Sequence, residues 1–419
     1  MIDVEDKKLF YSKVQLLFEL YERGYLKDIR LFKAFLDVEL AQFVPDDAIK
    51  LLKTIYPRFK IEQIYSDNPI LFYNQENRPD TVRTISAKHM ISIMIQNLLL
   101  NNEDDLLILG AKSGYIAVLA HHLAPEGKII IVEANSDIAK ITLDNIKKVN
   151  MQDKIKVVVK NPLEGMPELA PWKKILVTGA IKQSRLSQLL RQLDRDYGVL
   201  FAPVGEDLIS MYTQYIRTKD TYFAKKHLQV RFTPLITQVE YDELRLITDA
   251  EELERFNTPY KTMEEFNQED KIKHKPITIK YTDDILSELN LEPKKRRELF
   301  EIKPNNVFKA FLENVSHSID SLKSKQDLYY WSNTVDNFEL IVNLIKKLKK
   351  NIKINTRKLD MSINQIKTYN LIREEIEKQK DNNRNLKKDE LKEIIDKQLN
   401  ELDKLQVIVK KEIRSIKEN

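Results

Sequence analysis

The 419-residue sequence contains no cysteine, which excludes disulfides, thiolate metal sites and a cysteine nucleophile. Glycine is scarce, at 8 residues, and none occurs after residue 205. Proline does not occur after residue 304, and the six histidines form no metal-ligand pattern. Because glycine and proline are the usual interruptions of helices, we expect long helices in the C-terminal part. Because the histidines form no ligand pattern and cysteine is missing, we expect no metal site.

Long apolar runs are also missing. No stretch approaches 18 consecutive apolar residues, so no membrane-spanning helix is expected. The first ten residues, MIDVEDKKLF, carry charge from the third residue onward, unlike a secretory signal. We therefore expect a cytoplasmic protein with no membrane partner. The length suits two or three domains.

Charge is unevenly distributed along the chain. Residues 341–419 hold 21 Lys and Arg against 13 Asp and Glu, a net charge of +8, whereas the whole chain carries +5. A basic tail favours an anionic partner such as nucleic acid. The densest basic run, residues 346–358, has no interleaved aromatic residues, so it fits a solvated lysine-rich helix equally well. We favour the solvated helix, which leaves nucleic acid as the weaker alternative.

Short apolar runs alternate with helical patterns between residues 104 and 232. The expected strands are 106–110, 128–133, 154–160, 173–180 and 197–205, and the expected helices are 114–123, 136–149 and 184–193. Residues 207–217 and 222–232 alternate like a terminal antiparallel pair. This order predicts an α/β fold with a Rossmann-like, doubly wound and mostly parallel sheet. Ligands of such sheets bind at the carboxyl ends of the strands.

The region before this sheet is predicted to be helical at first. Expected helices cover 6–24, 28–36 and 48–56. Residues 57–84 contain three prolines and few periodic apolar positions, which predicts a long ordered loop or a lid. Ser86 is then expected to cap a helix over residues 86–100, because its hydroxyl can accept from early backbone N–H groups.

The C-terminal region carries a heptad-like pattern. Its apolar positions are Ile395, Leu399, Leu402, Leu405, Val409, Ile413 and Ile416. This pattern suits a helical hairpin or a coiled coil, and it leaves open whether the pairing lies within one chain or causes self-association between two. The polar stretch 381–385 is predicted to join two helices. Residues 240–305 give no firm assignment.

The turn GAKSG, residues 110–114, follows the first predicted strand. Gly110 and Gly114 lack the Cβ that would keep a ligand away from the backbone. Glu133 ends the second strand, 19 residues after Gly114, where a carboxylate can accept from both hydroxyls of a ribose. The turn contains Lys-Ser, but the spacing of a P-loop is not met. These residues indicate an adenosyl-type ligand site.

Several longer motifs occur in a fixed order. They include RTISAKHM at 83–90, LLILGAKSGYIAVLAHHL, IIIVEA, KILVTGA, FAPVG and finally VRFTPL at 230–235. Over about residues 10–238 the sequence resembles the protein-L-isoaspartate O-methyltransferases. The combination of TISAxHM with VRFxPL carries the resemblance, and YSDNPI at 65–70 also resembles a segment of that family.

The resemblance implies a function and a set of site residues. It implies methyl transfer from S-adenosyl-L-methionine to the carboxylate of isoaspartyl residues in a peptide or protein. Ser86 matches the family's active-site serine, and Val230 lies in the strand that resembles its peptide clamp. His89 is retained on the substrate side, although a structural role on the helix suits it equally well. The cofactor positions that match are Gly110, Ser113, Gly114, Tyr115 and Glu133.

The sequence departs from the family pattern at the cofactor turn. Ile108 replaces an acid in the first strand, and an apolar side chain cannot accept from the cofactor's amino group. Lys112 replaces the middle glycine, and its ammonium could pair with the methionine carboxylate. Asn161-Pro162 replaces Asp-Gly, and Asn161 could still accept from the adenine amino group. Lys88 replaces the proline of SAPHM. Each lost charged partner would cost on the order of 1.5–3 kcal/mol of binding.

Two main hypotheses follow. The first is an active protein carboxyl methyltransferase with an altered cofactor loop. The second is an inactive adapter that keeps the fold while the helical tail mediates assembly. We favour the enzyme over the adapter, and a nucleic-acid methyltransferase is a weaker third alternative. The expected domain division is 1–103 for the N-terminal helical and substrate-side segment, 104–238 for the cofactor-binding core, 239–305 for a linker or small mixed region, and 306–419 for a helical or coiled-coil domain.

Overall fold

The computed structural model describes residues 4–75, 78–206, 209–244, 246, 277–285, 302–325, 327–348, 356–379 and 386–416. The predicted connection at 381–385, much of the basic run at 346–358 and most of the unassigned region 240–305 lie outside these residues. The chain divides into two compact units. The α/β unit comprises Leu20–Lys60 and Asp67–Phe300, and the helical unit comprises Met1–Glu19, Ile61–Ser66 and Glu301–Asn419.

The α/β unit is built on an 8-stranded sheet in the order β10-β9-β8-β7-β6-β3-β4-β5. The strands are β3 (Leu106–Leu109), β4 (Ile129–Glu133), β5 (Ile155–Val159), β6 (Lys174–Val177), β7 (Asp196–Val204), β8 (Ser210–Thr218), β9 (Thr221–Val230) and β10 (Ile279–Tyr281). Strands β3 to β7 are parallel, β8 is antiparallel to β7 and β9, and β10 is parallel to β9. The predicted Rossmann-like, mostly parallel sheet is confirmed.

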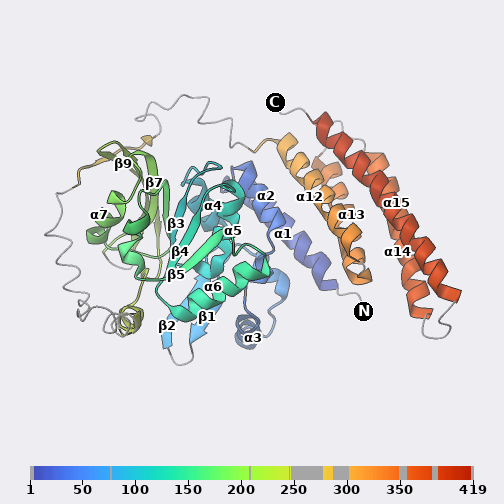
Figure 1. Ribbon diagram of the computed structural model, residues 1–419, viewed down its shortest axis with the longest axis horizontal. Coiled ribbons are helices and arrows are strands. Elements are labelled where there is room, and N and C mark those ends of the chain that lie inside the picture. Colours follow the sequence, from blue (N-terminus) through green and yellow to red (C-terminus); the bar gives the residue numbers. More distant parts are fainter. Residues whose placement is uncertain are drawn as a thin grey trace. The chain divides into compact units, whose positions relative to one another are not determined.

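Helices cover both faces of this sheet. They are α4 (Lys88–Gln96), α5 (Tyr115–Leu123), α6 (Ser136–Lys148) and α7 (Gln183–Arg191). Helix α2 (Ile29–Asp37) packs against α5, and the short 3-10 helix η1 (Leu40–Phe43) follows it. Helix α3 (Asp46–Ile55) packs against the separate strand β1 (Ile70–Gln75). Figure 1 shows α4, α5 and α6 on one side of the sheet and α7 on the other. Because both faces are covered, β3, β4 and β6 are buried along their whole length, which explains their continuous apolar sequences.

Strand β3 lies at the point where the strand order reverses. It pairs with β4 on one side and with β6 on the other. The helices that follow β3 and β6 cover opposite faces, so a crevice opens beyond the carboxyl ends of these strands. The residues that follow the strands at this edge are Gly110, Glu133 and Thr178.

The expected long loop over residues 57–84 is wrong for most of its second half. Residues 70–75 and 78–85 form the antiparallel strands β1 (Ile70–Gln75) and β2 (Arg78–Ile85). Ile70, Phe72 and Ile85 are buried, so the apolar side chains are spaced two apart at the start of β1.

The helical unit contains the four C-terminal helices and the N-terminal helix as far as Glu19. The helices are α1 (Val4–Glu22), α12 (Pro304–Ser324), α13 (Leu328–Leu348), α14 (Thr356–Gln379) and α15 (Leu386–Ser415). The predicted long helices are therefore confirmed for the described residues. Leu402, Leu405 and Val409 of the heptad-like pattern are fully buried, and α15 packs against α14 and α12 of the same chain.

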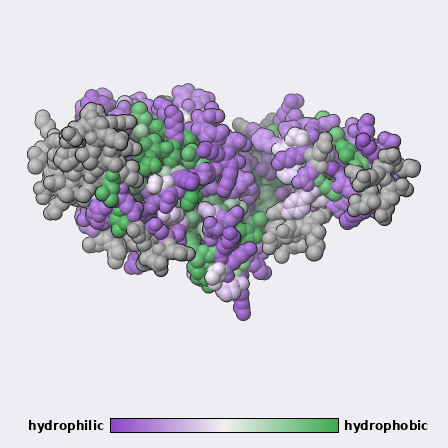
Figure 2. Space-filling view, turned by 60° about the horizontal axis from the view of Figure 1, so that its bottom comes forward, coloured by the Kyte–Doolittle hydropathy of each residue, from purple (hydrophilic) through white to green (hydrophobic). Residues whose placement is uncertain are grey.

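The surface is largely hydrophilic on the face drawn in Figure 2, with hydrophobic side chains gathered in smaller patches. Such patches are usual on folded proteins. Among the described helices, none combines the length and the apolar character that crossing a membrane requires.

Candidate functional site

The turn between β3 and α5 has an unusual backbone. Gly110, Lys112, Ser113 and Gly114 all have positive φ, at 93°, 44°, 59° and 86°. A Cβ on Gly110 would collide with the hydroxyl of Thr178, and one on Gly114 would press against α6. Both glycines are therefore required by conformation and by space. Lys112 and Ser113 adopt the left-handed region without being glycine, which strains the turn.

Glu133 connects this turn with the end of β4. Its side chain is buried, with Oε2 accepting from the Ala111 N–H at 2.9 Å and Oε1 accepting from the Asn135 N–H at 3.1 Å. Burial raises the pKa of Glu133 above its ordinary value, although the two backbone hydrogen bonds oppose this shift. The carboxylate therefore lies beside the turn, at the edge of the sheet where ligands bind in such folds.

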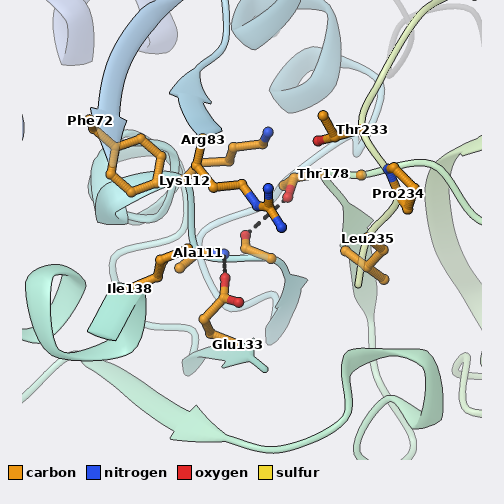
Figure 3. Close-up of a pocket in the computed structure, with 12 residues that line it drawn as sticks. Phe72, Arg83, Ala111, Lys112, Glu133, Ile138, Thr178, Thr233, Pro234 and Leu235 are labelled. Atoms are coloured by element: carbon orange, nitrogen blue, oxygen red, sulfur yellow. Dashed lines mark hydrogen bonds between the residues drawn. The ribbon is translucent and has the colours of Figure 1, made fainter. Parts of the chain in front are cut away.

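A pocket opens at this edge. It is lined by Phe72, Arg83, Gly110, Ala111, Lys112, Glu133, Ile138, Thr178, Gly179, Thr233, Pro234 and Leu235. Figure 3 shows the side chains of Lys112 and Arg83 on the same side of Glu133, with Thr178 and Leu235 across from Ile138. The cavity volume is about 20 Å³, which suits a single water molecule. An adenosyl group therefore requires lining side chains to move.

Lys112 enters this pocket from the turn. Its Nζ lies 5.6 Å from the centre of the Phe232 ring, within cation–π range. The pKa of Lys112 is lowered from 10.5 to about 8, mainly by burial and also by the positive charge of Arg83, while Glu133 opposes both effects. Lys112 is thus a half-buried cation whose charge responds to neighbouring groups.

Arg83 and Glu240 were missed by the sequence analysis. The guanidinium Nη2 donates to Glu240 Oε1 at 2.5 Å, and Glu240 Oε2 accepts from the N–H and the hydroxyl of Thr237. Arg83 stands at the start of RTISAKHM, so its place in the motif was a usable signal. Glu240 lies 157 residues away and offers no local signal at all.

Four expected cofactor residues, Ser113, Gly114, Tyr115 and Asn161, do not line the pocket. Tyr115 packs its ring against Phe35 and Phe43, at centroid distances of 6.4 and 5.2 Å. Ser113 is fully buried, and its hydroxyl has no hydrogen-bond partner among the described residues. Asn161 is buried at the N-terminus of the 3-10 helix η4 (Pro162–Glu164), where its Oδ1 accepts from the Leu163 N–H. Of the expected set, Gly110, Lys112 and Glu133 are brought together, and Gly114 closes the turn behind them.

The expected cap by Ser86 is wrong. The N-cap residue of α4 is Ala87, with no side-chain cap, and the His89 N–H donates instead to Asp67 Oδ1 at 2.9 Å. His89 Nδ1 also lies 2.9 Å from Asp67 Oδ2. Burial raises the pKa of Asp67, but the hydrogen bonds from His89 outweigh it, so the pKa is lowered overall. Ser86 follows β2 directly and is buried, and its hydroxyl does not cap α4.

Lys88 is the first residue of α4 and is 1% exposed. Its Nζ donates to the Asn68 carbonyl at 3.1 Å, and burial lowers its pKa from 10.5 to about 7, against the effect of Asp67. Lys88, His89 and Asp67 thus join the segment before β1 to the start of α4. Val230 ends β9 opposite Ser210 and is half-buried.

The chain was compared with known proteins. Residues 11–240 match the family described as protein-L-isoaspartate(D-aspartate) O-methyltransferase. A protein-L-isoaspartate O-methyltransferase of Methanopyrus kandleri is 30% identical over 245 residues, 57% of this chain and 98% of the relative. One of Ignicoccus hospitalis is also 30% identical, over 54% of this chain and 98% of the relative.

Among solved structures, one from Plasmodium falciparum is described as a protein-L-isoaspartate O-methyltransferase in complex with S-adenosyl-L-homocysteine. It is 23% identical, covers 53% of this chain and 97% of that chain, and has a TM-score of 0.42. The family match includes the Gly110–Gly114 turn, Glu133 and all the residues that line the pocket, and it ends before α12 to α15. The chain belongs to the protein-L-isoaspartate(D-aspartate) O-methyltransferase family.

Proposed function

We propose that this chain transfers a methyl group from S-adenosyl-L-methionine to the carboxylate of isoaspartyl residues in proteins. Its family supports the reaction, because the match covers nearly the whole length of the relatives. The observation that carries the proposal is the placement of the Glu133 carboxylate beside the Gly110–Gly114 turn, with Oε2 2.9 Å from the Ala111 nitrogen.

The residues at the sheet edge fit an adenosyl sulfonium in most respects. Glycines at the turn let backbone approach the ligand, and the two oxygens of Glu133 suit a ribose diol once they exchange their present N–H partners. When bound, S-adenosyl-L-methionine supplies an electrophilic methyl group on a positively charged sulfur. A cavity of about 20 Å³ demands that side chains such as Lys112 shift on binding.

Little acid–base chemistry is required of the protein. An isoaspartyl carboxylate is already a nucleophile at neutral pH, so its oxygen forms the new bond to carbon as the carbon–sulfur bond breaks. The products are a neutral methyl ester and a neutral thioether, and no proton moves. Positioning therefore supplies most of the rate enhancement. Ser86 would donate to the acceptor carboxylate, with Val230 and His89 on the peptide side.

Binding of the cofactor product is the first test. We expect S-adenosyl-L-homocysteine to bind in calorimetric titration, and Glu133→Gln to weaken the Kd by about 10-fold or more through loss of a charged acceptor. The control is the exposed acid variant Glu126→Gln, which should bind like the wild type. No heat up to millimolar ligand in a folded sample would refute the proposal.

Activity is the second test. An isoaspartyl peptide and its normal aspartyl counterpart are offered with radiolabelled S-adenosyl-L-methionine. We expect methylation of the isoaspartyl peptide alone, and a decrease of kcat/KM by about 10-fold or more in Ser86→Ala. Ser92→Ala is the control, because Ser92 is also buried in this region but bonds the Lys88 carbonyl at 2.9 Å.

The adapter hypothesis is the second candidate. Ile108, 1% exposed in the middle of β3, and the narrow pocket favour it, since both weaken the hold on a cofactor. An adapter would bind an isoaspartyl peptide in a fluorescence titration without S-adenosyl-L-homocysteine binding or methyl transfer. Binding of S-adenosyl-L-homocysteine that Glu133→Gln weakens would rule out this second candidate.

A further inference from the structure

The pocket holds an unusual set of charges for a ligand with an amino-acid group. Lys112 and Arg83 are both cations, and Glu133 is the only acid among the lining residues. Glu133 already accepts from two backbone N–H groups, and the proposed function assigns it to the ribose. An ammonium group entering beside Lys112 would therefore be repelled by two positive charges, whereas a carboxylate would be attracted by both.

Arg83 cannot be the main partner of such a carboxylate. Its guanidinium is committed to Glu240 at 2.5 Å, with side-chain exposures of 10% and 4%. Lys112 differs, because within the described residues it forms no ion pair and its ammonium rests over the Phe232 ring. A carboxylate placed near Lys112 would gain a charged hydrogen-bond donor.

We infer that Lys112 makes this pocket select adenosyl thioethers and sulfoniums by their carboxylate, while their ammonium contributes little to binding. The inference rests on the proposed function, because it assumes that the pocket takes an adenosyl ligand. The direction follows from two residues of the β3–α5 segment: Ile108 in β3 offers no acceptor for an ammonium, and Lys112 in the turn adds a donor for a carboxylate.

The electrostatic surroundings of Lys112 provide an independent readout. The charged groups that face it are Arg83 from β2, Glu133 from β4 and, through its pair with Arg83, Glu240. With a pKa of about 8, Lys112 is largely neutral at pH 9. A bound carboxylate favours the charged form, so binding at pH 9 should be accompanied by proton uptake.

The experiment titrates the full chain with three ligands: S-adenosyl-L-homocysteine, its analogue without the α-amino group, and its analogue without the carboxylate. At pH 7 we expect the deaminated analogue to bind within about 3-fold of the parent, and the decarboxylated analogue to bind at least about 10-fold more weakly. Titration at pH 9 in two buffers of different ionisation enthalpy measures the proton uptake.

Two variants distinguish the effect of the Lys112 charge from the effect of its left-handed backbone conformation. Lys112→Met keeps a long side chain at a φ of 44°, and Lys112→Gly relieves that φ. In both variants the preference for the carboxylate should fall to less than about 3-fold, and the proton uptake at pH 9 should disappear. Glu133 is present in all three proteins, so its own titration cannot produce the difference.

The outcomes distinguish the two proposals. Absence of binding by S-adenosyl-L-homocysteine would refute the proposed function. Binding of the parent with the opposite order of analogues, or with equal proton uptake in Lys112→Met, would overturn the inference about Lys112 alone. Binding in the expected order, lost in both variants, would support it.

Discussion

Arg83, which lines the pocket, forms a buried ion pair with Glu240, 157 residues away in the chain. Arg83 belongs to β2, immediately before the segment with Ser86, and Glu240 follows the VRFTPL segment. Glu240 Oε2 also accepts from the Thr237 N–H at 2.9 Å, so the pair fixes the start of the helical turn after the sheet. One interaction therefore joins the RTISAKHM motif to the residues that follow VRFTPL.

This pair predicts a large and non-additive loss of stability. Arg83→Met or Glu240→Gln alone leaves a buried, uncompensated charge, and each should lower the free energy of unfolding by about 3–5 kcal/mol. The double variant removes both charges and should lose less than the sum of the two. Urea unfolding of all four proteins measures the coupling. Single variants within about 1 kcal/mol of the wild type would contradict the prediction.

Two glycines, Gly24 and Gly110 in the turn after β3, allow the cost of a left-handed backbone to be separated from the cost of a steric collision. Gly24 and Gly110 both have positive φ, at 72° and 93°, but only Gly110 faces an atom that a Cβ would strike, the Thr178 hydroxyl. Gly24→Ala should cost about 1–2 kcal/mol from the left-handed backbone alone. Gly110→Ala should cost more, because Thr178 must also move. Equal losses in urea unfolding would mean that the turn rearranges freely.

Much of the sheet could be predicted because its signals are local. The apolar runs that became β3, β4 and β6 are separated by helical patterns, and Gly110 and Glu133 lie where each run ends. The periodicity alone therefore located the edge of the sheet and two of its pocket residues. The domain division and the roles of the site residues stay predictions.

The errors share a cause in tertiary structure. Ser86 was expected to cap α4, but Asp67, 22 residues from His89, accepts its N–H. Tyr115 follows the turn directly, yet its ring packs against Phe43 because a tyrosine at the first helical position faces the neighbouring helices. Contacts between distant segments decide such positions, and a single sequence does not display them.

The helical unit predicts a consequence of truncation. Residues as far as Glu19 belong to the same unit as α12 to α15, and the Phe18 ring lies 6.1 Å from that of Phe311. A variant that ends at residue 301 leaves Phe18 without this neighbour, so we expect it to bind a hydrophobic dye and to aggregate. A variant that spans only residues 20–301 is the control and should behave better. Equal behaviour of the first variant and the full chain would contradict the prediction.

Lys88 predicts a pH-dependent stability. Its folded pKa of about 7 lies below the ordinary value of 10.5, because burial disfavours the charged form. Between these pH values the unfolded chain binds a proton that the folded chain has released, so this group makes stability rise with pH across the window. Lys88→Met removes the group. Its stability relative to the wild type should therefore be greatest at pH 7 and below, and should decline toward pH 10.5.

The measurement is urea unfolding of Lys88→Met and the wild type at pH 6.5, 8 and 9.5. Lys50→Met is the control, because the Lys50 side chain is 76% exposed and its charge is hydrated in both states. The Lys88→Met difference should change with pH, and the Lys50→Met difference should stay flat. Loss of the hydrogen bond to the Asn68 carbonyl shifts the whole Lys88→Met curve but does not tilt it between pH 7 and 9.5. A pH-independent difference would show that Lys88 keeps its proton in the folded protein, which would place its ammonium in contact with water or an acid.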